Sequence, residues 1–329
     1  MEKSLDLSRW NEKPLGVPYR RWTITSLGLR QLVKTKLFRL FLMIGWASGL
    51  LIAITAFVFS QAVANGGWLE SYAAELGPRV GAIASAIGAL ILLYPDVCVG
   101  GLFTLMFWLQ STVALTLCLF AMTMIIPGLV TRDRNSNALT IYLSRPITSV
   151  DYLIGKFGTI LGVLLLLWTG PLVVGWAASM LLSPSRDFFV HSFGPITHAL
   201  YFNLIALFAL APLALGVSAV ARSSRGTVLL WLGLWLIMGF VARGPHTPSW
   251  LKHASITYNL EQVQRAVFQP GEALRKAAQD LPLLNRDVSR NLDRIGSKIE
   301  SGDAPSAYVG LTLLAGLSCV VFLRKLRAE

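Results

Sequence analysis

Long stretches without a charged residue alternate with short polar segments along this chain. Charged residues are absent from six stretches: 40–69, 97–131, 157–185, 188–221, 226–242 and 304–323. A helix needs about 20 mostly apolar residues to cross a bilayer core, within a range of about 17–25. Each stretch meets this requirement, so the pattern predicts six membrane-spanning helices.

A seventh apolar run, 80–95, is shorter than the bilayer core at about 1.5 Å per helical residue. Nine Lys or Arg in 1–39 and four in 131–156 assign both segments to the cytoplasm by the positive-inside rule. An even number of crossings must then separate these segments. We therefore expect 80–95 to be an interfacial or re-entrant segment on the outer side.

Residues 21–39 carry apolar side chains at helical spacing, with basic residues between them: Arg30, Lys34, Lys36 and Arg39. This pattern predicts an amphipathic helix in the cytoplasmic headgroup layer. A generic juxtamembrane anchor is the alternative interpretation. The net charge of +12 is concentrated here, which favours anionic membrane lipids over nucleic acid as the partner.

A short polar segment, 131–146, lies between two of the apolar stretches and is too short to be a domain. It predicts a loop with about two turns of helix, in which Asp133 can cap the start. Leu139, Tyr142 and Leu143 would share one face, and Arg145-Pro146 would end the helix. The segment is either an ordinary connecting loop or a docking element for a soluble partner.

The largest polar segment, 243–305, is nearly balanced, with nine Lys or Arg and seven acidic residues. Long segments cross a membrane largely regardless of charge. Helical spacing predicts two or three amphipathic helices forming an outer cap, from the stripes Leu260, Val263, Val267 and Val288, Leu292, Ile295, Ile299.

Composition and motifs exclude several function classes. Hydrophobic residues make up 54% and charged residues 14% of the chain, against about 25% charged in soluble domains. Gly155-Lys156 is no P-loop, because Val150 and Phe157 replace its first glycine and its Ser or Thr. Motifs of zinc proteases, serine hydrolases and dithiol enzymes are absent. We expect no catalytic residue, and a membrane-embedded enzyme is the least supported class.

The spacing of the cysteines and histidines does not predict a metal site. Cys98, Cys118 and Cys319 are far apart in apolar contexts, so free buried thiols are expected. Two histidine pairs, 191/198 and 246/253, fall on the predicted outer side and could hold copper or zinc. Solvated or capping histidines are far more common, so we assign no metal.

One segment resembles the signature of ABC-2 type permeases, the membrane subunits of ATP-driven exporters. It runs from Arg132-Asp133-Arg134-Asn135 and Ala138-Leu139 through Tyr142-Leu143-Ser144-Arg145-Pro146 to Tyr152-Leu153-Ile154-Gly155-Lys156. The six-span arrangement agrees over almost the whole chain. Segment 243–305 is larger than the re-entrant hairpin of many members, which leaves the shape of the outer gate open.

The resemblance implies an all-α integral membrane protein with six transmembrane helices. It also implies a cytoplasmic coupling helix, an N-terminal amphipathic interfacial helix and a helical extracytoplasmic insert before the last span. The coupling helix would seat in a separate ATP-binding subunit, present in two copies with two permeases. ATP and Mg would therefore bind to that partner and not to this chain. The coupling residues implied are Arg132, Asp133, Arg134, Asn135, Leu139, Tyr142, Leu143, Arg145 and Pro146.

The predicted organisation follows the chain in order. It comprises a cytoplasmic segment 1–20, the interfacial helix 21–39, span 38–62, outer loop 63–103, span 104–130, coupling loop 131–156, span 157–182, outer loop 183–195, span 196–221, turn 222–226, span 227–243, insert 244–305, span 306–323 and tail 324–329.

The implied function is export of an amphipathic or lipid-like substrate by a homodimer in the bacterial inner membrane, with both termini cytoplasmic. The spans contain few strongly polar groups, such as Gln110 and Asn203, which suits such a substrate. Small residues in the spans also suit simple helix packing. The alternative is a mechanotransmission complex that acts on a periplasmic partner through 244–305 without moving a substrate. The sequence does not identify the substrate.

Overall fold

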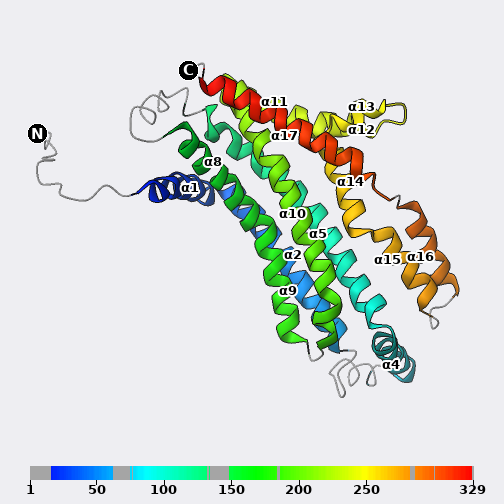
Figure 1. Cartoon of the computed structure of the whole chain (residues 1–329). Coiled ribbons are helices and arrows are strands. Elements are labelled where there is room, and N and C mark those ends of the chain that lie inside the picture. The colour runs from blue at the N-terminus through cyan, green and yellow to red at the C-terminus, as the bar shows by residue number, and fades with distance from the viewer. Residues whose placement is uncertain are drawn as a thin grey trace, which may run out of the picture.

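The computed structural model describes residues 16–61, 75, 77–131, 133, 148–183, 186–281, 286–299 and 301–327. Within them, every regular element is a helix (Figure 1). In chain order these are α1 (Val17–Val33), α2 (Lys36–Gln61), α4 (Pro78–Leu93), η2 (Asp96–Gly100), α5 (Gly101–Leu129), α8 (Ser149–Leu164), η3 (Leu165–Thr169), α9 (Gly170–Leu182), α10 (Arg186–Val220), α11 (Ser224–Leu232), η4 (Gly233–Ile237), α12 (Met238–Ala242), α13 (Ser249–His253), α14 (Ile256–Phe268), α15 (Pro270–Asp280), α16 (Arg286–Lys298) and α17 (Ala304–Arg327).

Six helical stretches in the described residues are long and apolar enough to cross a membrane. They are Lys36–Gln61, Asp96–Leu129, Val150–Leu182, Phe188–Val220, Ser224–Ala242 and Ala304–Lys325. The predicted number of spans and the all-α membrane class are confirmed. The second span starts at Asp96 and not at 104, because α5 begins at Gly101 and is continuous with the π turn η2.

The first and third spans approach each other closely through glycines. A Cβ atom on Gly45 of α2 would lie 2.8 Å from the carbonyl oxygen of Leu167, and one on Gly175 of α9 would lie 2.5 Å from that of Gly49. Pro171 has no N–H to donate to the Leu167 carbonyl four residues earlier. The absence of a side chain at Gly45 therefore lets α2 cover this carbonyl directly.

The predicted interfacial helix 21–39 is shifted toward the N-terminus, because α1 begins at Val17, within the segment 1–20 that was predicted to precede it. Helix α1 ends at Val33, and Thr35 turns the chain by donating from both its backbone N–H (2.9 Å) and its hydroxyl (2.7 Å) to the Leu32 carbonyl. Lys36 and Arg39 therefore belong to the first turns of α2 and not to an interfacial helix 21–39, as was predicted. Arg30 stays on α1, and Lys34 is its C-cap.

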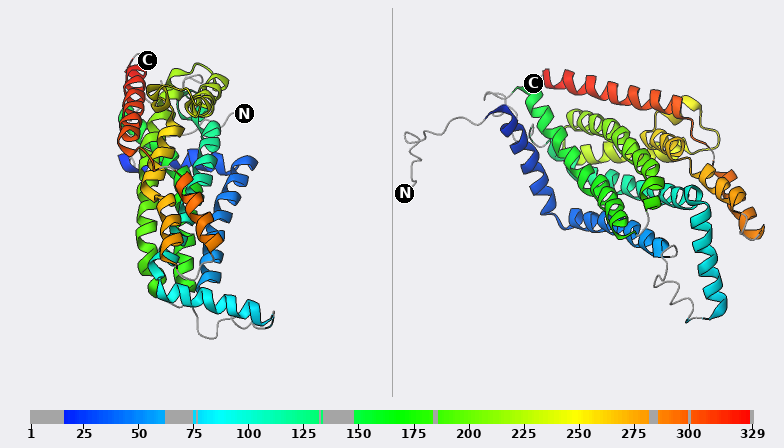
Figure 2. Two further views of the ribbon diagram at one scale, coloured as in Figure 1. Left: turned by 90° about the vertical axis from the view of Figure 1, so that its right-hand side faces the viewer. Right: turned by 60° about the horizontal axis from the view of Figure 1, so that its bottom comes forward.

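Helices α1 and α4 lie at opposite ends of the bundle. Helix α1 and the C-terminal end of α17 are at one end (Figure 1), whereas α4 runs across the other end (Figure 2). Helix α4 is not among the six candidate spans. This arrangement is the one expected of an interfacial segment at 80–95, although its position relative to a bilayer stays a prediction.

The segment before the last span is not simply a cap. Helix α14 packs between α5, α10 and α17, where Leu260, Val263 and Phe268 are buried. Its buried Gln264 donates to the Trp108 carbonyl of α5 at 3.0 Å, so the polar group is satisfied inside the bundle. Helices α15 and α16 form a pair beside the bundle (Figure 1).

The cysteines are free, as expected, but they differ in burial. Cys118 is buried, Cys98 is half-buried and Cys319 is exposed. The prediction of buried thiols is therefore wrong for Cys319, which lines an open pocket between α17 and α10.

Candidate functional site

The ends of several spans meet where the signature segment begins. Thr131 and Asp133 are described at one end of this segment, and residues 148–183 at the other. The other predicted coupling residues lie outside the described residues: Arg132, Arg134, Asn135, Leu139, Tyr142, Leu143, Arg145 and Pro146. The structure therefore defines how both ends of this segment are held, and its interior stays a sequence prediction.

Asp133 is held by the first two turns of α8. The Lys156 ammonium lies 2.7 Å from its carboxylate, and the Tyr152 hydroxyl donates to the same oxygen at 2.7 Å. Lys156 also donates to the Gly128 carbonyl at 3.0 Å, and Tyr152 lies 2.8 Å from the Leu129 carbonyl. Lys156 thus gives the Gly128 carbonyl a partner, and the single Tyr152 hydroxyl proton lies between Asp133 and the Leu129 carbonyl. Both carbonyls are at the C-terminal end of α5, where a helix leaves its last carbonyls without a partner of its own. Residue 133 and the start of the third span are thus tied to the end of the second.

A second cluster, of the hydroxyl residues Thr131, Ser218 and Thr227, joins α5 to α10 and α11. The Ser218 hydroxyl donates to the Ile126 carbonyl at 2.7 Å and accepts from the Val130 N–H at 2.9 Å. Ser218 therefore bridges the Val130 N–H and the Ile126 carbonyl, which would bond directly to each other in a regular helix. Thr131 donates to the Ser218 carbonyl at 2.7 Å and lies 3.0 Å from the Thr227 hydroxyl. This hydroxyl cluster is fully buried.

Replacing Ser218 by alanine is expected to destabilise the protein by about 2 kcal/mol, because buried backbone groups lose a partner. Thermal unfolding of the detergent-solubilised chain measures this. Ser318→Ala is the matched control, since the Ser318 hydroxyl donates to Leu314 in its own helix. Equal stability of the two variants would show that the hydroxyl cluster does not hold the end of α5.

The N-terminus of α8 is capped and joined to α1. Thr148 and Asp151 form a reciprocal capping box, in which the Thr148 hydroxyl accepts from the Asp151 N–H at 3.2 Å. Asp151 also accepts from the Arg21 guanidinium at 2.7 and 2.5 Å. The sequence analysis identified neither the Thr148 cap nor Arg21. An ion pair with one half-exposed partner adds little stability, so its main effect is to orient α1.

Helix α1 packs along the glycines of α8. A Cβ atom on Gly155 would lie 2.8 Å from Ile24, and one on Gly158 would lie 2.5 Å from the Thr25 hydroxyl. Thr25 donates to the Gly155 carbonyl at 2.9 Å. Helix α1 is therefore docked onto the start of the third span, so the two helices are mechanically joined.

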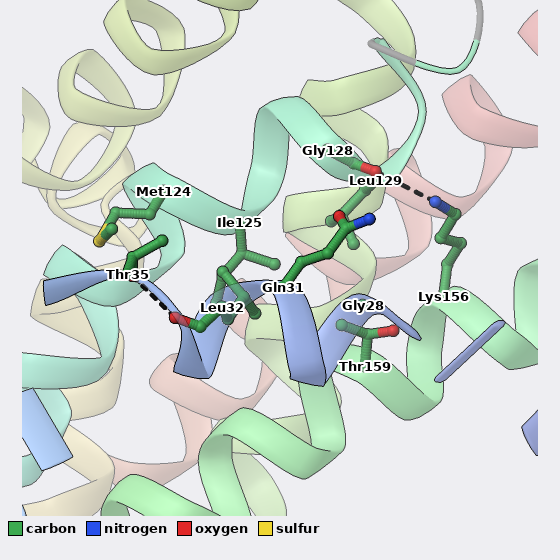
Figure 3. Close-up of a pocket in the computed structure, with 10 residues that line it drawn as sticks. All are labelled: Gly28, Gln31, Leu32, Thr35, Met124, Ile125, Gly128, Leu129, Lys156 and Thr159. Atoms are coloured by element: carbon green, nitrogen blue, oxygen red, sulfur yellow. Dashed lines mark hydrogen bonds between the residues drawn. The ribbon is translucent and has the colours of Figure 1, made fainter. Parts of the chain in front are cut away.

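A cavity of about 150 Å³ separates α1 from the end of α5 (Figure 3). Gln31 and Leu32 of α1, Ile125 of α5, and Lys156 and Thr159 of α8 are among its lining residues. Helix α1 is thus packed tightly on α8 but not on α5 here. The contacts of the described residues join the ends of several helices and are suited to transmitting movement between them.

A comparison with models of known protein families identifies the family of this chain. Residues 29–245, more than half of the chain, match the model described as "ABC-2 family transporter protein". The chain belongs to the ABC-2 transporter family. The match covers the first five spans and the signature segment, so the protein is a multi-pass membrane permease that works with an ABC ATP-binding partner. A search of curated proteins finds no match to it.

Sequence reasoning found part of this permease site. Tyr152 and Lys156 were in the quoted signature but had no assigned role, and Asp133 was assigned to a helix cap and to the partner contact. The structure gives Asp133 partners on α8, while its contact with an ATPase stays a prediction. Ser218 and Thr227 were missed, because single hydroxyl residues in apolar spans carry no pattern that marks them.

Proposed function

We propose that this chain couples ATP hydrolysis in a separate ATP-binding subunit to export of an amphipathic or lipid-like substrate. Two copies of the chain would assemble as a homodimer with two ATPase subunits in a bacterial inner membrane, with both termini in the cytoplasm. The coupling residues from Arg132 to Pro146 would contact the ATPase. ATP and Mg would bind only to that subunit, so the chain itself would catalyse no reaction.

The anchoring of segment 131–148 is the observation that carries this proposal. Asp133 is tied to α8 and, through Lys156 and Tyr152, to the end of α5. Thr131 is tied to α10 and α11 through Ser218 and Thr227. A force applied to this segment would therefore act on the second, third, fourth and fifth spans together. Docking of α1 on α8 would carry the same movement to the interfacial helix, which bears Arg30 and Lys34.

Reversing two charges in the segment tests the coupling assignment. Arg132→Glu with Arg134→Glu is expected to lower co-purification of the ATPase subunit at least about tenfold, because each arginine would lose a charge-assisted contact. The measurement is a pull-down of the tagged chain from detergent-solubilised native membranes, with bound proteins identified by mass spectrometry.

The matched control reverses Arg222, in the turn before α11, and Arg225, in the first turn of α11, which are three positions apart. This variant should keep the ATPase bound. Equal binding by both variants would contradict the assignment of residues 132–146 as the docking element. Loss of binding in both would point to a general charge effect of the cytoplasmic face.

Mechanotransmission is the second candidate function. The paired helices α15 and α16 beside the bundle favour it, because Val288 and Ile295 of α16 are about half exposed. A stoichiometric outer partner that is lost when residues 286–299 are deleted would support mechanotransmission. Stimulation of the ATPase by an added amphiphile would support export.

A further inference from the structure

A pocket of about 280 Å³ lies beneath α14, between α5 and the fifth span. This volume is close to the lower end of the range of about 300–1,000 Å³ found for small-molecule sites. Aromatic and aliphatic side chains make up about half of the lining, among them Trp108, Leu115 and Leu119 on α5 and Trp235 and Phe240 on the fifth span. Threonines of α5 and α14 lie between them. These positions on α5 lie near the middle of the span Asp96–Leu129. The pocket can therefore hold a hydrocarbon chain within the depth of the membrane.

Charged residues border the same pocket. Glu261 of α14 accepts from Arg243 at 2.9 Å and from Arg265 at 2.6 Å. One carboxylate therefore binds two guanidinium groups. The charged lining residues, Arg243, Arg265 and Glu261, have a net charge of +1. The side chain of Arg243 is 57% exposed and that of Arg265 is 30% exposed, so both can reach a further anion. Guanidinium groups bind carboxylates in well-defined geometry.

Trp235 gives an independent indication of a ligand. Its side chain is 6% exposed, and its indole N–H has no hydrogen-bond acceptor among the described residues. Trp231, one turn earlier, donates to the Leu119 carbonyl at 3.0 Å. A buried donor without an acceptor costs free energy, and this cost is larger where water is scarce. The indole nitrogen is covered by protein atoms, so it would gain a carboxylate oxygen of a bound molecule as its acceptor when the indole turns toward the pocket.

We propose that this pocket binds a single-chain amphiphile with a carboxylate head and an aliphatic tail. The tail lies between α5 and the fifth span, and the head lies against Arg243 and Arg265 in competition with Glu261. The inference names a substrate class for the proposed export function and rests on that function only for the direction of movement. Binding itself requires no ATPase.

Two variants of the same ion-pair group separate ligand binding from structural support. Arg243→Gln is expected to weaken binding of dodecanoate about tenfold, since a charged contact to the head is lost. Glu261→Gln is expected to strengthen it several-fold, because the competing carboxylate is gone. If the three residues served only to hold α14 in place, both changes would lower binding.

The experiment uses the purified full-length chain in phosphatidylcholine nanodiscs, without ATPase. The probe is dodecanoate with a diazirine near the end of its chain, and mass spectrometry locates the labelled residues. Labelling is expected within 108–119 and 235–240, displaced by unlabelled dodecanoate. Its methyl ester should displace the probe weakly and equally in wild type and Arg243→Gln. Arg290→Gln is the control, since Arg290 is exposed on α16, outside the pocket.

A bulky variant tests the path of the tail. Thr116→Phe places a ring in the pocket from an exposed position on α5 and is expected to abolish labelling by acid and ester alike. The inference is overturned if Glu261→Gln weakens binding, or if labelling is spread evenly over the lipid-facing surface. The pull-down of the ATPase is a separate result, so either proposal can fail without the other.

Discussion

Replacing Lys156 by methionine is expected to destabilise the permease by about 3 kcal/mol and to lower ATP-dependent activity of its complex at least about tenfold. Lys156 and Asp133 have side chains only 14% and 18% exposed. Removing one partner of such a pair leaves a poorly solvated charge, which costs about 3–5 kcal/mol when burial is complete. Thermal unfolding in detergent and ATPase activity of the reconstituted complex measure the two effects.

The double variant Asp133→Leu with Lys156→Met separates stability from coupling. Without either charge no unpaired ion remains, so stability should return close to that of the wild type. ATPase activity should stay low, because residue 133 is no longer tied to α8. Lys276→Met, at an exposed position on α15, is the control and should change neither quantity. Normal ATPase activity in the double variant would show that this ion pair has no part in coupling.

Replacing Gly49 by alanine is expected to destabilise the contact between the first and third spans by about 2 kcal/mol, within the range for overpacked cores. A Cβ atom at this position would overlap the carbonyl oxygen of Pro171. The neighbouring atoms are backbone on both helices, because a Cβ atom on Gly175 would in turn lie 2.5 Å from the Gly49 carbonyl oxygen. Thermal unfolding of the purified chain in detergent checks the result.

Gly101→Ala is the matched control for this contact. Gly101 has helical dihedral angles, φ −63° and ψ −44°, and a Cβ atom there would meet nothing within 4 Å. Alanine is favoured over glycine in a helix interior by about 1 kcal/mol, so this variant should be at least as stable as the wild type. Equal stability of Gly49→Ala and Gly101→Ala would mean that the two spans can separate slightly without cost.

The close contacts between helices explain why only part of the site could be predicted. The signature located Tyr152 and Lys156, because they stand at fixed spacing from Asp133 in the sequence. Their bonds to α5 depend on how α8 packs against the end of that helix, and sequence spacing does not report this. The length of α1 was overestimated because helical periodicity continues through Lys36 and Arg39, although Thr35 interrupts the helix.

The sequence by itself determined the membrane class, the six spans and the position of the signature segment. Charge-free runs of sufficient length are decisive, because a backbone in lipid must satisfy its hydrogen bonds internally and so forms helices. Only the tertiary structure decided that Ser218 completes the last turn of α5, that α14 packs inside the bundle, and that Glu261 serves both Arg243 and Arg265. These contacts join helices far apart in the chain, and they depend on packing geometry that hydrophobic periodicity does not encode.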